Sequence, residues 1–208
     1  MLSLNYSTVI DPLLQDVRIL IPKFTDMKEG TRGLDICCGT GDQVFYYAKQ
    51  GITATGIDSS LAMIDTAKRK KERMGIDNIF FHVGDARELP FEDNYFDFAS
   101  TTLGMHEITA QERDKAISEM KRVVKPQGFL VFVDFRVPLP KNMLTFLIRG
   151  IEHLASKAQY ENFQSYIDEG GILVLLKRNG LIPQKTAYLK FGTLLMVKVP
   201  NNKKSPKE

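Results

Sequence analysis

The residues best suited to chemistry in this chain lie in two short segments, LDICCGTGD at 34–42 and GID at 56–58. In the first, an apolar run passes into a glycine-rich turn, and in the second an apolar run ends in the carboxylate of Asp58. An acidic residue about 20 positions after such glycines is typical of a strand–helix–strand unit that binds a nucleotide-type ligand. Gly39 and Gly41 would let the backbone approach that ligand closely, and Asp58 could accept two hydrogen bonds from a ribose diol.

The residues that follow the glycines decide which ligand suits this turn. The dinucleotide pattern G-x-G-x-x-G/A would place a small residue where this chain has Val44, and Asp42 directly follows the second glycine. A carboxylate at a helix start repels a pyrophosphate, which the positive end of the helix would otherwise attract. S-adenosylmethionine fits better, because it has a ribose, no phosphate, and positive ammonium and sulfonium groups. A dinucleotide cofactor, and a turn that binds nothing, remain the alternatives.

Alternating strands and helices are needed to hold these segments in place. Apolar runs predict strands at 34–38, 54–58, 79–83, 96–102 and 129–135. Helical spacing predicts helices at 9–24, 42–49, between Ser60 and Gly75, and after Thr109. Two last runs, 185–190 and 193–199, predict a hairpin around Gly192 that closes the sheet. The pattern predicts an α/β, Rossmann-like fold with a mostly parallel seven-stranded sheet and helices on both faces.

Local signals predict where several of these elements start and stop. Asp11-Pro12 predicts a helix start, and Thr109-x-x-Glu112 predicts a capping box. Ser60 is expected to cap a helix whose inner face consists of Leu61, Ile64 and Ala67. Residues 125–128 predict a turn.

The chain is expected to form one domain over 1–200, followed by a frayed tail at 201–208. An N-terminal helical lid is expected at 1–30, and a helical insertion on the acceptor side is expected at 138–180. Within that insertion, helices are expected at 143–154, around 161–169, and at 171–179. The first is amphipathic: it could pack on the sheet, roof an apolar pocket or touch a membrane surface.

Four segments, in order, resemble the class I S-adenosylmethionine-dependent methyltransferases: LDICCGTGD at 34–42, GIDSS at 56–60, GDARELPFEDNYFD at 84–97 and VVKPQG at 123–128. The chain looks most like the ubiquinone and menaquinone biosynthesis branch and its small-molecule and phospholipid methyltransferase relatives. The resemblance covers about residues 32 to 136, half of the chain. It implies a class I methyltransferase fold and S-adenosylmethionine as cofactor, with S-adenosylhomocysteine as product, but says little about the methyl acceptor.

The resemblance also implies roles for particular residues. Asp35, Gly39 and Gly41 would hold the methionine end of the cofactor, and Asp58 would bind the ribose hydroxyls. Leu103, after the fourth strand, would line the methionine pocket.

Three further residues are implied at the adenine end. Asp85 would accept from the adenine amino group and the backbone of Ala86 would address the ring, although Gly84-Asp85 also reads as a plain turn. Met63 could lie against the adenine or belong to the core.

His106 is the candidate catalytic residue, because it follows the fourth strand at the edge where ligands bind in such sheets. A histidine there could act as a general base near neutral pH, with Glu107 beside it and Asp134 at the end of the fifth strand. A loop histidine that contacts a carboxylate or the backbone is the plainer alternative. Methyl transfer needs a base only when the acceptor is protonated and weakly acidic.

Several departures from the family pattern reduce the number of acceptor classes that the chain could methylate. The chain lacks the N-terminal stretch and the signature near the fourth strand of the quinone enzymes, which disfavours quinone ring methylation. Cys37 and Cys38 are its only cysteines, which disfavours arsenite methylation and a zinc site and suits a reducing cytoplasm; no metal is expected. The segment 102–106, TLGMH, lacks the Asn/Asp-Pro-Pro-aromatic motif of many protein and nucleic-acid methyltransferases. A small-molecule or lipid acceptor remains.

The overall composition excludes other classes. Hydrophobic residues at 43% and charged residues at 25% are ordinary for a globular protein in water, and no apolar run is long enough to span a membrane. The N-terminus shows no signal peptide, so a cytoplasmic location is expected. The net charge of +3 is mild, so no nucleic-acid partner is expected.

Two functions from different classes fit these observations. The first is a cytoplasmic methyltransferase, monomeric or dimeric, with a small and apolar acceptor that could bring peripheral membrane contact. The second is an S-adenosylmethionine-binding partner or regulator without its own catalysis. An acceptor pocket beside the methyl group would distinguish them.

Overall fold

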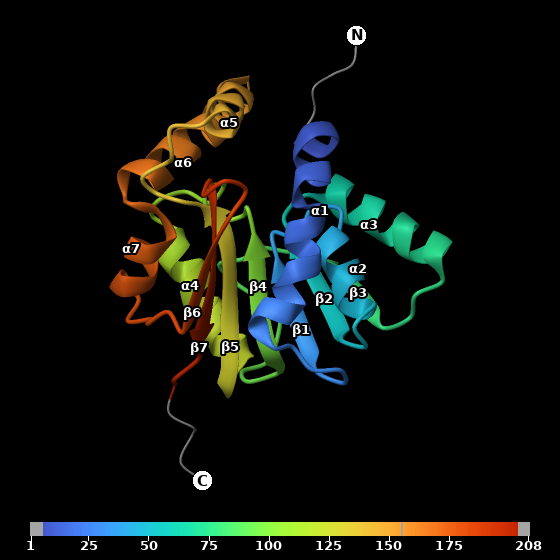
Figure 1. The fold of residues 1–208 in the computed structure, drawn as a ribbon. Coiled ribbons are helices and arrows are strands. Elements are labelled where there is room, and N and C mark those ends of the chain that lie inside the picture. Colours follow the sequence, from blue (N-terminus) through green and yellow to red (C-terminus); the bar gives the residue numbers. More distant parts are fainter. Residues whose placement is uncertain (1–5, 155, 204–208) are drawn as a thin grey trace.

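The computed structural model describes residues 6–154 and 156–203, with side chains described within 14–153 and 156–203. Seven strands form one sheet in the order β3-β2-β1-β4-β5-β7-β6 (Figure 1). They are β1 (Arg32–Ile36), β2 (Thr53–Asp58), β3 (Ile79–Val83), β4 (Phe96–Thr102), β5 (Val124–Phe135), β6 (Lys185–Leu189) and β7 (Leu194–Pro200). The first five strands pair in parallel, and β7 pairs antiparallel with both β5 and β6. The predicted α/β sheet and its closing hairpin are confirmed.

Helices cover the sheet from both sides, as predicted for a parallel sheet. They are α1 (Tyr6–Thr25), α2 (Asp42–Ala48), α3 (Leu61–Met74), α4 (Arg113–Val123), α5 (Met143–Leu154), α6 (Lys157–Asp168) and α7 (Gly171–Arg178). Figure 1 shows α1, α2 and α3 gathered to one side, α4 and α7 to the other, and α5 with α6 above one end of the sheet. Among the residues described, no helix is long and apolar enough to cross a membrane.

β1 ends earlier than expected. The predicted strand 34–38 includes both cysteines, whereas β1 stops at Ile36 and Cys37 takes a positive φ of 55°. Such a φ breaks an extended strand. Cys37 and Cys38 therefore lie in the turn after the strand, both as free thiols.

α3 follows its predicted caps but not all of its predicted face. The Ser60 side chain accepts from the Met63 backbone N–H at 3.4 Å, and the helix ends at Gly75 with φ 61°. Ile64 and Ala67 are fully buried, but Leu61 is 61% exposed. The expectation for Leu61 was wrong because it lies about 90° around the helix from the middle of the buried face.

α4 starts later than the predicted capping box. The Thr109 hydroxyl donates to the Glu112 carboxylate at 2.7 Å, and the helix begins only at Arg113, without a side-chain cap. The expected capping box is therefore wrong, because the Thr109 hydroxyl is bonded to the Glu112 carboxylate and accepts from no backbone N–H of the helix. The predicted turn at 125–128 is also different: it lies within β5 as an irregularity in the register opposite β4.

Two other helix starts differ from the prediction. α1 begins at Tyr6, ahead of Asp11-Pro12. A proline inside a helix removes one backbone hydrogen bond but need not end it. α6 begins at Lys157 because Ser156 and Gln159 form a capping box that the sequence analysis passed over.

The predicted tail is partly anchored. Asn201 is 1% exposed, and its side-chain amide donates to the Val124 carbonyl at 2.8 Å. Its backbone N–H donates to the Gly128 carbonyl at 2.8 Å, so the chain remains ordered past β7. Residues 204–208 of that predicted tail lie outside the described residues.

Candidate active site

A cleft of about 1070 Å³ opens at the carboxyl ends of β1, β2, β3 and β4. Ligands of parallel α/β sheets bind at this edge. Six of the predicted site residues line the cleft: Gly39, Asp58, Met63, Asp85, Ala86 and Leu103. Leu14 and Arg18 of α1 and Phe146, Leu147, Ile151 and Glu152 of α5 complete its walls. Its volume lies at the upper end of the roughly 300–1,000 Å³ typical of small-molecule pockets.

Asp58 is held at the end of β2 by backbone donors. One carboxylate oxygen accepts from the Gly39 N–H at 2.8 Å, and the other accepts from the Ser60 N–H at 2.9 Å. These bonds join the two glycine-turn segments recognised in the sequence. Each carboxylate oxygen keeps a lone pair for a further donor in the cleft.

Gly39 and Gly41 differ in what surrounds them. A Cβ on Gly39 would meet nothing within 4 Å, and the residue, with φ 53°, lines the cleft. A Cβ on Gly41 would lie 2.5 Å from the Phe81 ring and 3.2 Å from the Ala67 Cβ. Gly41 does not line the cleft, and its expected approach to a ligand stays a prediction. It is glycine because helix α2 starts there tightly against α3 and β3.

Asp35 points into the sheet rather than into the cleft. Its side chain is 3% exposed and accepts from the Ser100 hydroxyl at 2.6 Å, and Ser100 in turn accepts from the Tyr47 hydroxyl at 2.9 Å. Asp35 and Ser100 are register partners on β1 and β4, so both side chains face the same side. Burial raises the pKa of Asp35 to about 7. The expected carboxylate contact with a ligand is not found in this arrangement.

Asp85 is engaged by a neighbour that the sequence analysis did not single out. The Arg87 Nε donates to both carboxylate oxygens of Asp85, at 2.8 and 2.7 Å, and Arg87 also pairs with Glu112. The hydrogen bond from Arg87 lowers the pKa of Asp85. Asp85 also accepts from the Arg87 backbone N–H at 2.8 Å, which is the turn role considered as an alternative. Ala86 lies between them in the cleft wall.

Met63 and Leu103 lie on opposite walls of the site. Met63, in the first turn of α3, is 45% exposed and so does not belong to the core. Leu103 is 7% exposed, with a positive φ of 55°, and its N–H donates to the Val133 carbonyl at 2.7 Å. This backbone bend turns the chain after β4 across the mouth of the sheet.

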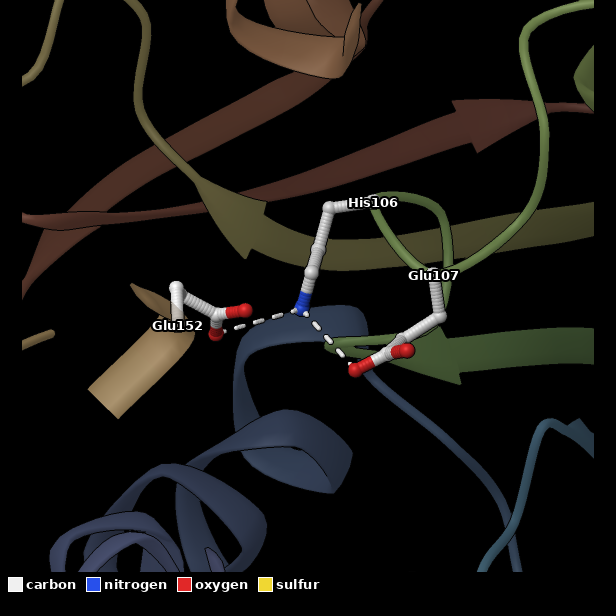
Figure 2. Close-up of side chains that lie close together, drawn as sticks. All are labelled: His106, Glu107 and Glu152. Atoms are coloured by element: carbon white, nitrogen blue, oxygen red, sulfur yellow. Dashed lines mark ion pairs between the residues drawn. The ribbon is translucent and has the colours of Figure 1, made fainter. Parts of the chain in front are cut away.

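His106 is fully buried and lies behind the cleft wall rather than in it. Its Nδ1 lies 2.7 Å from the Asp134 carboxylate, and its ring packs against Phe135. Its Nε2 has no hydrogen-bond partner and points between two carboxylates, 3.7 Å from Glu107 and 3.9 Å from Glu152 (Figure 2). The loop histidine expected at the ligand edge is therefore screened from the cleft by these two glutamates, which both line it.

The three carboxylates decide the ionisation of His106. Burial by itself lowers the pKa of the imidazole, but the charge and hydrogen bond of Asp134, with Glu152 and Glu107, raise it to about 9. Burial raises the pKa of Glu152, which is only 3% exposed.

Glu152 was missed in the sequence, although a signal was present. It follows Ile148 by four positions, so it lies on the buried stripe of α5 where an apolar residue is expected. An acid on an apolar stripe marks a buried charge that needs a partner.

Basic side chains neutralise only part of the acidic cleft. Asp42 pairs with Arg18 at 3.5 Å and with Lys70, so the acid that disfavoured a pyrophosphate is itself paired. Within the described part of the chain, no lysine or arginine pairs with Asp58, Glu107 or Glu152. The cleft therefore favours a ligand that carries positive charge.

Comparison with known proteins finds similarity to methyltransferases over part of the chain. Residues 34–128 match the family model described as a methyltransferase domain. That segment contains most of β1, all of β2 to β4, helices α2 to α4 and the glycine turn.

Two curated relatives are demethylmenaquinone methyltransferases. The one from Paenarthrobacter aurescens is 36% identical over 154 residues, which cover 72% of this chain and 58% of the relative. The one from Staphylococcus aureus is 39% identical over 121 residues, which cover 57% of this chain and 48% of the relative. The chain spans about half the length of the curated relatives that it matches.

A solved structure shows the same fold over nearly the whole chain. The S-adenosylmethionine-dependent methyltransferase from Aquifex aeolicus superposes with a TM-score of 0.68 at 21% identity, over 92% of this chain and 96% of its own. The Rossmann-like fold therefore extends beyond the matched segment.

Proposed function

We propose that the protein transfers a methyl group from S-adenosylmethionine to a small-molecule acceptor, because residues 34–128 match the family model described as a methyltransferase domain. The observation that carries the proposal is the cleft itself, in which Gly39 leaves open space beside the fixed carboxylate of Asp58. The large volume of the cleft supports catalysis over a regulator that only binds the cofactor.

The residues of the cleft fit the cofactor. Asp58 would accept from the ribose hydroxyls, and the open face of Gly39 would lie against the methionine end. The acids without a lysine or arginine partner would attract the ammonium and sulfonium charges. When bound, the cofactor supplies a methyl group on a sulfonium that leaves as a neutral thioether. The protein supplies orientation and exclusion of water, which in favourable cases contribute roughly 7–11 kcal/mol.

Helices on two sides support a covered acceptor site. Leu14 of α1 and Phe146, Leu147 and Ile151 of α5 line the same cleft as Asp58. We therefore keep 1–30 as a lid and 138–180 as an acceptor-side insertion of one domain over 1–200. The apolar wall suits a small aromatic or lipid-like acceptor.

The acceptor class proposed is a reduced quinone. The support is the name of the two curated relatives together with the apolar wall from α5. The missing quinone-enzyme signatures disfavour this acceptor, whereas the similarity to the two curated relatives favours it. Peripheral membrane contact through α5 stays a prediction, which vesicle co-sedimentation would test.

His106 would assist the acceptor only indirectly. Because His106 does not line the cleft and its pKa is raised to about 9, the carboxylate of Glu107 or Glu152 would take a proton from an acceptor hydroxyl or ring carbon. His106 is therefore proposed as a positioning residue for these two carboxylates rather than as the base that touches the acceptor.

Calorimetric titration of S-adenosylmethionine and S-adenosylhomocysteine into the purified protein tests the cofactor. Asp58→Ala should weaken binding by roughly 1–3 kcal/mol because it removes charge-assisted hydrogen bonds. Asp77→Ala, an exposed acid outside the cleft, is the matched control. Wild-type protein that binds neither compound would overturn the proposal. Binding without turnover over a panel of reduced quinones and phenols would instead favour the regulatory alternative.

A further inference from the structure

Three potential ligand atoms converge beside the cleft. The His106 Nε2 and one carboxylate oxygen each from Glu107 and Glu152 all lie within 4.8 Å of one another. His106 and Glu107 come from the loop after β4, and Glu152 reaches them from α5 on the other side (Figure 2). Two segments far apart in the sequence thus meet at one point.

Asp134 fixes the orientation of the histidine ring. Its carboxylate accepts from the backbone N–H of Met105 at 3.0 Å, of His106 at 3.3 Å and of Phe135 at 2.7 Å. Because the Asp134 oxygens already accept from these backbone donors, the Nδ1 N–H of His106 is the donor in the bond between the two side chains. Nε2 is then the nitrogen turned to the two glutamates. A histidine held through its other nitrogen by a carboxylate is the usual arrangement behind a metal-binding imidazole.

Among the described residues, the buried His106 is the one basic side chain within ion-pair distance of the two glutamates. Within the described ranges, neither Glu107 nor Glu152 pairs with a lysine or arginine, and the Nε2 between them, fully buried, has no hydrogen-bond partner. Two carboxylates and a nitrogen that converge in this way resemble a ligand set more than a packed core.

From this geometry we propose that His106, Glu107 and Glu152 bind a divalent cation, with its open coordination positions facing the cleft. One imidazole and two carboxylates suit Mn²⁺ or Zn²⁺ among the common ions. Bonds of about 2.0–2.2 Å place two ligand atoms of one ion roughly 3 to 3.7 Å apart. The separations of 3.7 and 3.9 Å from Nε2 lie near this range, and the two carboxylate oxygens, within 4.8 Å of each other, would move closer by about 1 Å around the ion. The cation would present a Lewis acid to an oxygen of the acceptor in the cleft.

Titration of Mn²⁺ into chelator-treated protein, followed by the electron paramagnetic resonance signal of free Mn²⁺, tests the site. Mn²⁺ is preferred to Zn²⁺ as the probe because Cys37 lines the same cleft and thiolates attract zinc. We expect one saturable site, with affinity reduced roughly tenfold or more in Glu152→Gln and in Glu107→Gln. Glu112→Gln is the control, because Glu112 lines the cleft but pairs with Arg87, and it should bind Mn²⁺ as the wild type does.

Each outcome either supports or overturns the cation site. No saturable binding by the wild type, or equal loss in Glu112→Gln, would overturn the cation site and leave His106 as an imidazolium paired with its carboxylates. Circular dichroism checks the fold of each variant. If Glu152→Gln does not fold, the partly exposed Glu107→Gln carries the test. S-adenosylhomocysteine binding, measured on the same sample, separates failure of the cation site from failure of the proposed methyl transfer.

Discussion

At the scale of single residues, residues of one type that look equivalent in the sequence have different surroundings in the fold. Gly39 faces the open cleft, whereas Gly41 lies against Phe81 and Ala67. Asp58 ends a strand and faces the cleft, whereas Asp35 lies within a strand and faces Ser100. The residue types were recognisable from the sequence, but the direction of each side chain depends on which segments pack beside it.

The two glycines should respond differently to alanine. Gly41→Ala should destabilise the protein by roughly 1–3 kcal/mol, because its Cβ would overlap the Phe81 ring and its φ of 81° is strained for alanine. Gly39→Ala should cost only about 1 kcal/mol, from its positive φ, but should weaken S-adenosylhomocysteine binding. Urea unfolding and calorimetry measure the two effects. A larger stability loss at Gly39 than at Gly41 would contradict this assignment.

Asp35 should make stability depend on pH. Its pKa of about 7 in the fold exceeds its unfolded value of about 3.9, so the folded state binds the proton more tightly. The resulting stabilisation is full below about pH 4 and is lost as the pH rises through about 7. Asp35→Asn stays neutral, so its melting temperature relative to the wild type should increase from about pH 5 to about pH 8. A difference that does not change with pH would refute the raised pKa.

At the scale of elements, α5 is amphipathic, yet several of its apolar side chains remain exposed. Ile148 is buried, whereas Met143 is 87% and Phe146 is 82% exposed. Of these two exposed residues, only Phe146 lines the cleft. The apolar spacing predicted the helix correctly, but it could not show which apolar side chains face a ligand.

Phe146 should therefore affect the acceptor and not the cofactor. Phe146→Ser should raise KM for apolar acceptors roughly tenfold or more, because burying a Phe side chain contributes about 1.5–3 kcal/mol, and should leave S-adenosylhomocysteine affinity unchanged. Met143→Ser, on the same helix and equally exposed, should change neither. Steady-state kinetics with a reduced quinone and calorimetry distinguish the two variants. Equal effects of both substitutions would argue against a roof formed by Phe146.

At the scale of the whole molecule, Arg113 connects the loop after β4 to α6. It is fully buried, its Nε donates to the Met105 carbonyl at 3.0 Å, and its other nitrogens donate to the Asn162 carbonyl at 2.7 Å and the Glu169 carboxylate at 3.1 Å. The same loop carries His106 and Glu107. This single side chain thus ties the helical insertion to the site.

Loss of that connection should affect stability far more than loss of a surface ion pair. Arg113→Met should cost about 3 kcal/mol, because it leaves the buried Met105 carbonyl without its donor and breaks the pair of the buried guanidinium with the partly exposed Glu169. Arg178→Met also removes a partner of Glu169, but Arg178 is 40% exposed, so about 1 kcal/mol or less is expected. Thermal unfolding of both variants measures the difference. Similar losses of stability in the two variants would show that the buried contacts of Arg113 contribute no more than a surface ion pair.

The sequence by itself determined the sheet, the glycine turn and its acid, and the closing hairpin. The strands at 79–83 and 96–102 have the bounds predicted, because strand and helix periodicity is a local property of the chain. The tertiary structure alone decided that Asp35 is buried, that Gly41 packs on Phe81, and that Glu152 meets His106. These facts depend on long-range packing, which brings distant segments together and sets the burial and charge around each group. No local pattern of residues contains that information.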